Sequence, residues 1–140
     1  VEDNLANGAI PHITYLKEGV VTTTSTTEEV LNTTAAGETL ETSIARDFLI
    51  TYSVNVSALP SPGHWVNVSK VDIITDTGVF KQRATPENVR IAHSTDAGTT
   101  VTVTFFADNV PPGTYGVNVT IESDVTGVGL HNQTITVIAL

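Results

Sequence analysis

The sequence predicts an all-β protein, an antiparallel sandwich of about seven strands, and three observations support this prediction. Residues 114–121 alternate apolar side chains with small or polar ones, and residues 100–106 do the same before the Pro111-Pro112-Gly113 turn. A period of two is typical of a strand with one face in a core and one in water. Tyr115 lies two residues after Gly113 of the turn, where sandwich folds place a tyrosine whose hydroxyl bonds nearby backbone.

The N-terminal third is rich in threonine, a β-branched residue that favours strands over helices. We expect one strand at 11–17 and another at 19–27. Residues 38–44 fit one helical turn, a short strand or a loop. Because seven later strands already suffice for a sandwich, residues 1–18 are predicted to be an extended N-terminal arm and residues 19–140 the sandwich domain.

From residue 47 onward, alternating runs separated by Pro, Gly, Asn and Asp turns predict the seven strands. The apolar phase slips within the second run, which predicts a β-bulge near Ser69 and Lys70. The expected strands are 47–56, 65–75, 79–83, 89–93, 99–107, 114–121 and 133–140. The expected inward side chains are Phe48, Ile50, Tyr52, Val54, Val101, Val103, Phe105, Tyr115, Val117 and Val119. The expected outward ones are Thr51, Asn55, Thr102 and Asn118.

Composition restricts the compartment and the partners. The chain has 15 acidic and 6 basic residues, a formal net charge of −9, and no cysteine. The basic residues do not cluster, so no nucleic-acid footprint is expected, and no apolar run reaches the ~20 residues of a membrane span. The chain begins with Val1 rather than methionine, which favours removal of a signal peptide over a trimmed chain. We therefore expect an extracellular, cell-surface location.

The acceptor pattern Asn-x-Ser/Thr gives the best functional signal in the sequence. Composition alone would produce about two matches, and the chain has five. An N-glycan needs solvent around it, and the strand phase predicts that several of these asparagines face outward. The predicted glycosylation sites are Asn32, Asn55, Asn67, Asn118 and Asn132.

Other chemistry is weakly signalled. The four histidines (His12, His64, His93 and His131) lack metal-ligand spacing, and Asp72, Asp76 and Asp96 lack the density of a calcium loop. We expect no metal and no cofactor. No nucleophile elbow or phosphate loop is present, so an enzyme is not expected. Trp65 with Tyr52 or Tyr115 could form a sugar-binding platform, but a tryptophan at this place in a sandwich is more often core.

The unit at 111–120, the strand at 47–56 and the Thr-rich, cysteine-free, sequon-dense composition resemble secreted surface proteins of archaea. Short single-domain subunits of extracellular threads and pili are the most similar of these. The resemblance implies an immunoglobulin-like or jelly-roll-like sandwich that polymerises with copies of itself by donor-strand exchange, without catalytic residues. In this mechanism an arm of one subunit fills an open edge of the next.

The apolar residues of the arm, Ile10, Ile13, Tyr15 and Leu16, are the expected interface with the neighbouring subunit. The predicted function is thus a glycosylated structural subunit of an extracellular filament. One alternative is a non-polymerising immunoglobulin-like module of a cell surface or surface layer, or one that binds carbohydrate. A second alternative is a virion structural protein.

Overall fold

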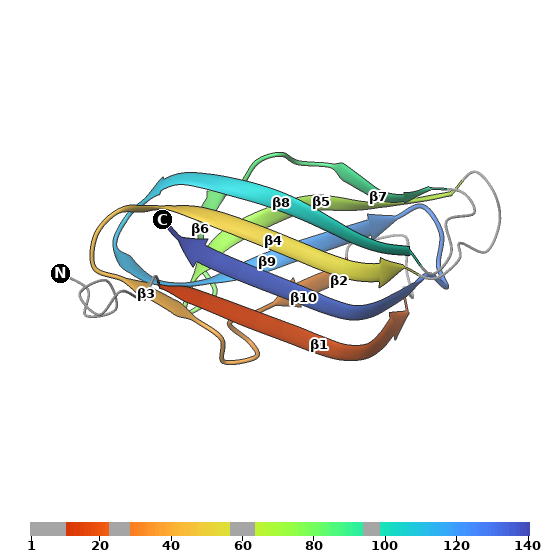
Figure 1. Ribbon diagram of the computed structural model, residues 1–140, viewed down its shortest axis with the longest axis horizontal. Coiled ribbons are helices and arrows are strands. Elements are labelled where there is room, and N and C mark those ends of the chain that lie inside the picture. The colour runs from red at the N-terminus through yellow and green to blue at the C-terminus, as the bar shows by residue number, and fades with distance from the viewer. Residues whose placement is uncertain (1–10, 23–28, 57–63, 94–98) are drawn as a thin grey trace.

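The computed structural model of the chain describes residues 11–22, 29–56, 64–93 and 99–140, and these form a two-layered antiparallel β-sandwich without a helix (Figure 1). One sheet, sheet A, has the order β1-β10-β4-β8, and the other, sheet B, has the order β2-β9-β5-β6. Two further short strands belong to sheet B. β3 pairs with residues 113–115 of β9, whereas β2 pairs with residues 118–121. β7 pairs with residues 65–68 of β5, whereas β6 pairs with residues 72–74. The strands are β1 (His12–Thr22), β2 (Glu29–Asn32), β3 (Leu40–Thr42), β4 (Arg46–Val56), β5 (Trp65–Thr75), β6 (Phe80–Arg83), β7 (Val89–His93), β8 (Thr99–Val110), β9 (Gly113–Ser123) and β10 (Gly129–Ala139).

The predicted all-β sandwich is confirmed, and so are the seven strands that follow residue 46. The N-terminal third differs from the prediction. The expected break near residue 18 is a β-bulge between Lys17 and Val20, with Gly19 at φ 82°, so β1 is one continuous strand. Residues 23–27 of the expected second strand lie outside the described residues. Residues 40–42 form a short strand, one of the three alternatives left open for residues 38–44. The last strand begins at Gly129, earlier than expected, because a second bulge between His131 and Thr134 lets it continue.

The core lies between the sheets and is filled by the inward phase of each long strand. In β4 every second residue from Arg46 to Val56 is buried. The predicted bulge in β5 is confirmed by the register shift between Val68 and Lys70. Most of the predicted inward residues are buried. Val101 and Val103 are only half-buried, because β8 is the edge strand of sheet A.

The corner between β8 and β9 has the expected tyrosine contact. The hydroxyl of Tyr115 donates a hydrogen bond of 2.7 Å to the carbonyl of Pro111. The ring of Tyr115 packs edge-on against Phe48 of sheet A, with 5.9 Å between the ring centroids. The corner therefore ties a turn to the core through one side chain.

Candidate functional site

The two lateral sides of the sandwich differ. On the side of β8, the sheets are joined by a β-bridge between Thr85 and Phe106, with N–O distances of 2.9 and 2.8 Å. The side-chain amide of Gln82 also donates to the carbonyl of Asp108 at 2.7 Å. These bonds link sheet B to the edge of sheet A, so this side is closed.

The opposite side, between β1 and β2, is open in the part of the chain that the structure describes. These two strands are the end strands of their sheets in the described part of the chain. A hollow of about 370 Å³ lies between them. Its lining is mostly apolar and consists of Tyr15, Val30, Leu31, Ala35, Ala36, Ile121 and Leu130. Three polar side chains complete it: Lys17, Asn32 and Gln133. We call this hollow and the two strand edges beside it the open side.

Two large apolar side chains on these edge strands are exposed. Val30 on β2 is 55% exposed and lines the hollow, and Leu16 on β1 is 49% exposed. The interior end of the hollow reaches Gln133, whose Oε1 accepts a 2.6 Å hydrogen bond from Tyr52 in the core. The open side thus offers apolar surface and two strand edges that no other described strand pairs, the features that bind an added strand.

The structure places the residues predicted for the arm in different environments. Ile13 is 8% exposed and belongs to the core, Tyr15 is half-buried and lines the hollow, and Leu16 is exposed. Ile10 lies outside the described residues. From His12 to Lys17 the strand pairs in register with β10 of the same chain. Exchange of an arm between copies stays a prediction, because a single chain is described.

The five predicted glycosylation sites lie on different parts of the surface. Asn32 is in β2 and lines the open side, and Asn67 and Asn118 lie on the outer face of sheet B. Asn55 and Asn132 are brought together, since both line a smaller hollow of about 290 Å³ on sheet A. Glycosylation itself stays a prediction at each of them.

Asn118 is less exposed than expected. It lies between Asn32 and Asp72 in the cross-strand register, and its Oδ1 is buried without a hydrogen-bond partner. Asn118 has the expected outward phase, between the buried Val117 and Val119, but it is half-buried rather than exposed. Asn55 is also half-buried, and its Nδ2 donates to Thr100 Oγ1 at 3.2 Å.

Trp65 does not lie in the core. Its backbone is two residues before Asn67 on β5, so both side chains are on the outer face while Val66 is fully buried. The indole is half-buried, and Cζ of Arg90 lies 5.2 Å from its ring centroid. The platform of several aromatic rings does not form, because Tyr52 and Tyr115 are buried.

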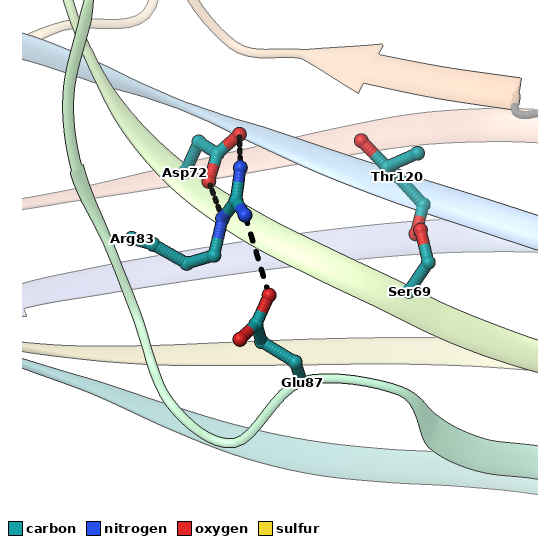
Figure 2. A network of polar contacts seen from close by, with 5 residues as sticks. All are labelled: Ser69, Asp72, Arg83, Glu87 and Thr120. Carbon is teal, nitrogen blue, oxygen red and sulfur yellow. Dashed lines mark hydrogen bonds and ion pairs between the residues drawn. The ribbon is translucent and has the colours of Figure 1, made fainter.

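An ion-paired network on sheet B was missed by the sequence analysis (Figure 2). Arg83 donates through Nε to Asp72 at 2.8 Å and through Nη1 to Glu87 at 3.3 Å. The hydrogen bond to Asp72 raises the pKa of the guanidinium. Asp72 and Arg83 are cross-strand partners in the hairpin of β5 and β6. The Asp76-Thr77-Gly78 turn signal could have predicted that pairing. Because Asp72 is committed to Arg83, its role is structural.

Metal-binding residues do not converge in the described ranges. No group of three or more His, Asp or Glu side chains could hold a metal among residues 11–22, 29–56, 64–93 and 99–140. His64 contacts Asp124, with 3.2 Å between Nδ1 and Oδ2. Burial works against ionisation of Asp124, but the backbone N–H of Trp65 and the His64 ring outweigh it and lower the pKa of this carboxyl. Asp96 and the side chain of His93 lie outside what the structure describes.

Among the residues that the structure describes, no helix has the length and apolar character of a membrane span.

The fold and the site define a β-sandwich protein with one closed and one open lateral side. No family model and no curated protein matches the sequence. Among solved structures, the fold is similar to that of the infectious bursal disease virus Gx strain, with a TM-score of 0.53 and 9% identity over 91% of this chain. The VP2 subviral particle of the same virus gives a TM-score of 0.52 and 8% identity, also over 91% of this chain.

This chain spans 32% of the length of each of those two viral chains. A carbohydrate-binding module, CBM6cm-2 from the Cellvibrio mixtus lichenase 5A, is also similar. Its TM-score is 0.44 and its identity 15%, over 90% of this chain and 95% of that chain. At these identities the viral likeness establishes the fold, a β-sandwich of the jelly-roll kind.

Proposed function

We propose that this chain is a non-catalytic structural subunit of an extracellular assembly and that its open side takes up an extended strand from a second copy. The observation that carries the proposal is the apolar hollow of about 370 Å³ between two end strands. Unpaired strand edges offer backbone donors and acceptors to an added strand, and a hollow beside them takes its alternate side chains. The excess of sequons and the low charge favour an extracellular surface.

The proposed occupant is residues 1–10 of the second copy. These ten residues precede β1, and they include the apolar side chains Leu5 and Ile10. They also carry Glu2 and Asp3, whose charge is complementary to Lys17 in the hollow. An extended segment of ten residues spans roughly 33 Å, enough to run along an edge strand of eleven residues for most of its length.

Sedimentation velocity and electron microscopy of the purified chain test the proposal. The wild type is expected to form oligomers or thin fibres. Val30→Glu puts a charge at the rim of the apolar hollow and should leave a monomer. Val79→Glu is the matched control, because Val79 is 60% exposed but lies in the turn between β5 and β6, away from the open side. A monomeric wild type, or equal loss of assembly in both variants, contradicts the proposal.

Removal of residues 1–10 tests the occupant. The truncated chain should stay folded and monomeric, and a synthetic peptide of residues 1–10 should bind it. Binding should be lost in the Val30→Glu background. Assembly that persists without these residues would show that another part of the surface joins the copies.

A second candidate function is a non-polymerising surface module that binds free carbohydrate on sheet B. The position of Trp65 on the outer face, with Arg90 over its ring, favours it. Trp65 is the single tryptophan of the chain, so its fluorescence reports binding there directly. Titration with soluble oligosaccharides should then change the emission with saturation, and Trp65→Phe should abolish binding measured by calorimetry.

A further inference from the structure

We infer that Asn67 is an N-glycan acceptor and that the first sugar attached to it packs on the side chains of Trp65 and Arg90. The sequence pattern alone cannot rank the five candidate asparagines. Their side-chain contacts can, because the sugar is carried by Nδ2 while Oδ1 stays free to accept a hydrogen bond.

The amide of Asn67 is oriented for this modification. Its Oδ1 accepts a hydrogen bond of 2.7 Å from Nε of Arg90, and this contact uses the oxygen and spares the nitrogen. Arg90 is the cross-strand partner of Asn67 on β7, so the ladder holds the two side chains together. A sugar on Nδ2 leaves the Arg90 bond intact.

Two other sequons are less favourable, for different reasons. Nδ2 of Asn55 is the atom that donates to Thr100 Oγ1, so attachment of a sugar there competes with an existing bond. Asn118 has a buried Oδ1 between two neighbouring polar side chains, which leaves little room for a sugar. These two are the least suitable acceptors.

Asn32 and Asn132 also use Oδ1 rather than Nδ2. Oδ1 of Asn32 accepts a hydrogen bond from the backbone N–H of Ala35, and Oδ1 of Asn132 accepts one from that of Gly19, each at 3.1 Å. Asn32 lines the same hollow as Tyr15. Among the described residues, neither Asn32 nor Asn132 has beside it a ring with a cation over it, as Trp65 has with Arg90. Trp65 and Asn67 project from the same face of one strand, roughly 7 Å apart along it. The guanidinium of Arg90 bridges them, 5.2 Å from the indole centroid.

This pair of side chains suits the first sugar. The indole offers an apolar face to the C–H groups of a pyranose ring, and the guanidinium has N–H donors for its hydroxyl groups. In the transfer step, Nδ2 of Asn67 forms a bond to C1 of the sugar and loses a proton to the transferase. The bond between C1 and the phosphate of a lipid-linked donor breaks, and the lipid phosphate leaves.

Secretion of the whole chain from a eukaryotic host that attaches N-linked glycans tests the site. Peptide mapping by mass spectrometry should find Asn67 occupied. Asn67→Gln should remove that glycan, and the matched variant Asn118→Gln should leave the mass unchanged. An unmodified Asn67 in a chain whose other sequons are occupied overturns the inference.

The emission of Trp65 tests the sugar contact. An endoglycosidase that leaves only the first sugar on Asn67 should keep the emission maximum. Complete removal by an amidase, which converts Asn67 to Asp, should shift the maximum to longer wavelength, because the indole gains water. The unglycosylated wild type and the unglycosylated Asn67→Asp variant, compared with each other, give the part of the shift that is due to the new carboxylate. In the Asn67→Gln variant, amidase treatment of the remaining glycans should cause no shift. An emission maximum that is the same with and without the first sugar overturns the packing of that sugar on Trp65.

Discussion

The hydroxyl of Tyr52 donates a 2.6 Å hydrogen bond to Oε1 of Gln133, and both side chains are buried. Tyr52 lies in β4 and Gln133 in β10, so the bond crosses two neighbouring strands of sheet A from within the core. The bond gives a partner to Oε1 of Gln133, a buried side chain that lines the open side. Gln133 lies within the bulge of β10. Four predictions follow from this bond and from two further contacts.

Tyr52→Phe should destabilise the chain by about 1–3 kcal/mol, because it leaves the buried amide of Gln133 without its donor. Urea denaturation measures this change. Gln133→Leu combined with Tyr52→Phe removes both polar partners and should recover part of the loss. A single variant as stable as the wild type would show that Gln133 finds another partner.

Stability should fall at alkaline pH through Tyr52. Burial raises the pKa of this phenol well above its ordinary value of 10.0. Because this pKa is higher in the folded state than in the unfolded state, the contribution of Tyr52 to the free energy of unfolding is complete below pH 10. That contribution is lost as the pH rises. The slope for one such group is about 1.4 kcal/mol per pH unit above pH 10. Urea denaturation at several pH values between 9 and 12 should show that the free energy of unfolding falls less steeply with pH in Tyr52→Phe than in the wild type. Equal slopes would contradict the prediction.

Gly116→Ala should destabilise the chain by about 1–3 kcal/mol, through overpacking of a covered position. A Cβ at Gly116 would lie 2.0 Å from Oγ1 of Thr34 and 2.8 Å from Oγ1 of Thr33. Adding Thr34→Ala should recover part of the stability. Thr34→Ala alone should be neutral or stabilising, because this hydroxyl is buried without a partner. Thermal unfolding of the three variants gives the comparison, and an unaffected Gly116→Ala would rule out the close approach.

Tyr115→Phe should cost about 0.5–1.5 kcal/mol, less than Tyr52→Phe. The hydroxyl of Tyr115 bonds the carbonyl of Pro111, which is exposed, so water can replace the lost donor. The same urea experiment ranks the two tyrosines. The reverse order would mean that the corner, rather than the core bond, is the more important contact.

The sequence predicted the parts of the fold in which one strand face is buried throughout. β4 and β9 were predicted closely, because alternation and flanking turns determine both the extent and the phase of such strands. β1 was split in two, since a glycine that forms a bulge looks like a turn when only the sequence is seen. The short strand β3 has three residues and no periodic signal.

The candidate site was harder to predict. The open side depends on which strands end each sheet, and strand order is not contained in any local pattern. The position of Trp65 could have been predicted, because it shares a strand face with Asn67, which was expected to face outward if Val66 and Val68 face inward. The cross-strand contact of Asn67 with Arg90 needed the pairing of β5 with β7, which are separated by β6 in sequence.

The pairing of β1 with β10 has a consequence for mechanical force. His12 and Ile138 are opposite each other, so the start of β1 and the end of β10 lie at the same end of the sandwich (Figure 1). We expect tension between these two ends to load the ladder one pair at a time and to peel β1 away at low force, with Ile13 leaving the core early. The proposed strand from another copy, bound along β1, would instead be pulled along its own length, and its hydrogen bonds would share the load.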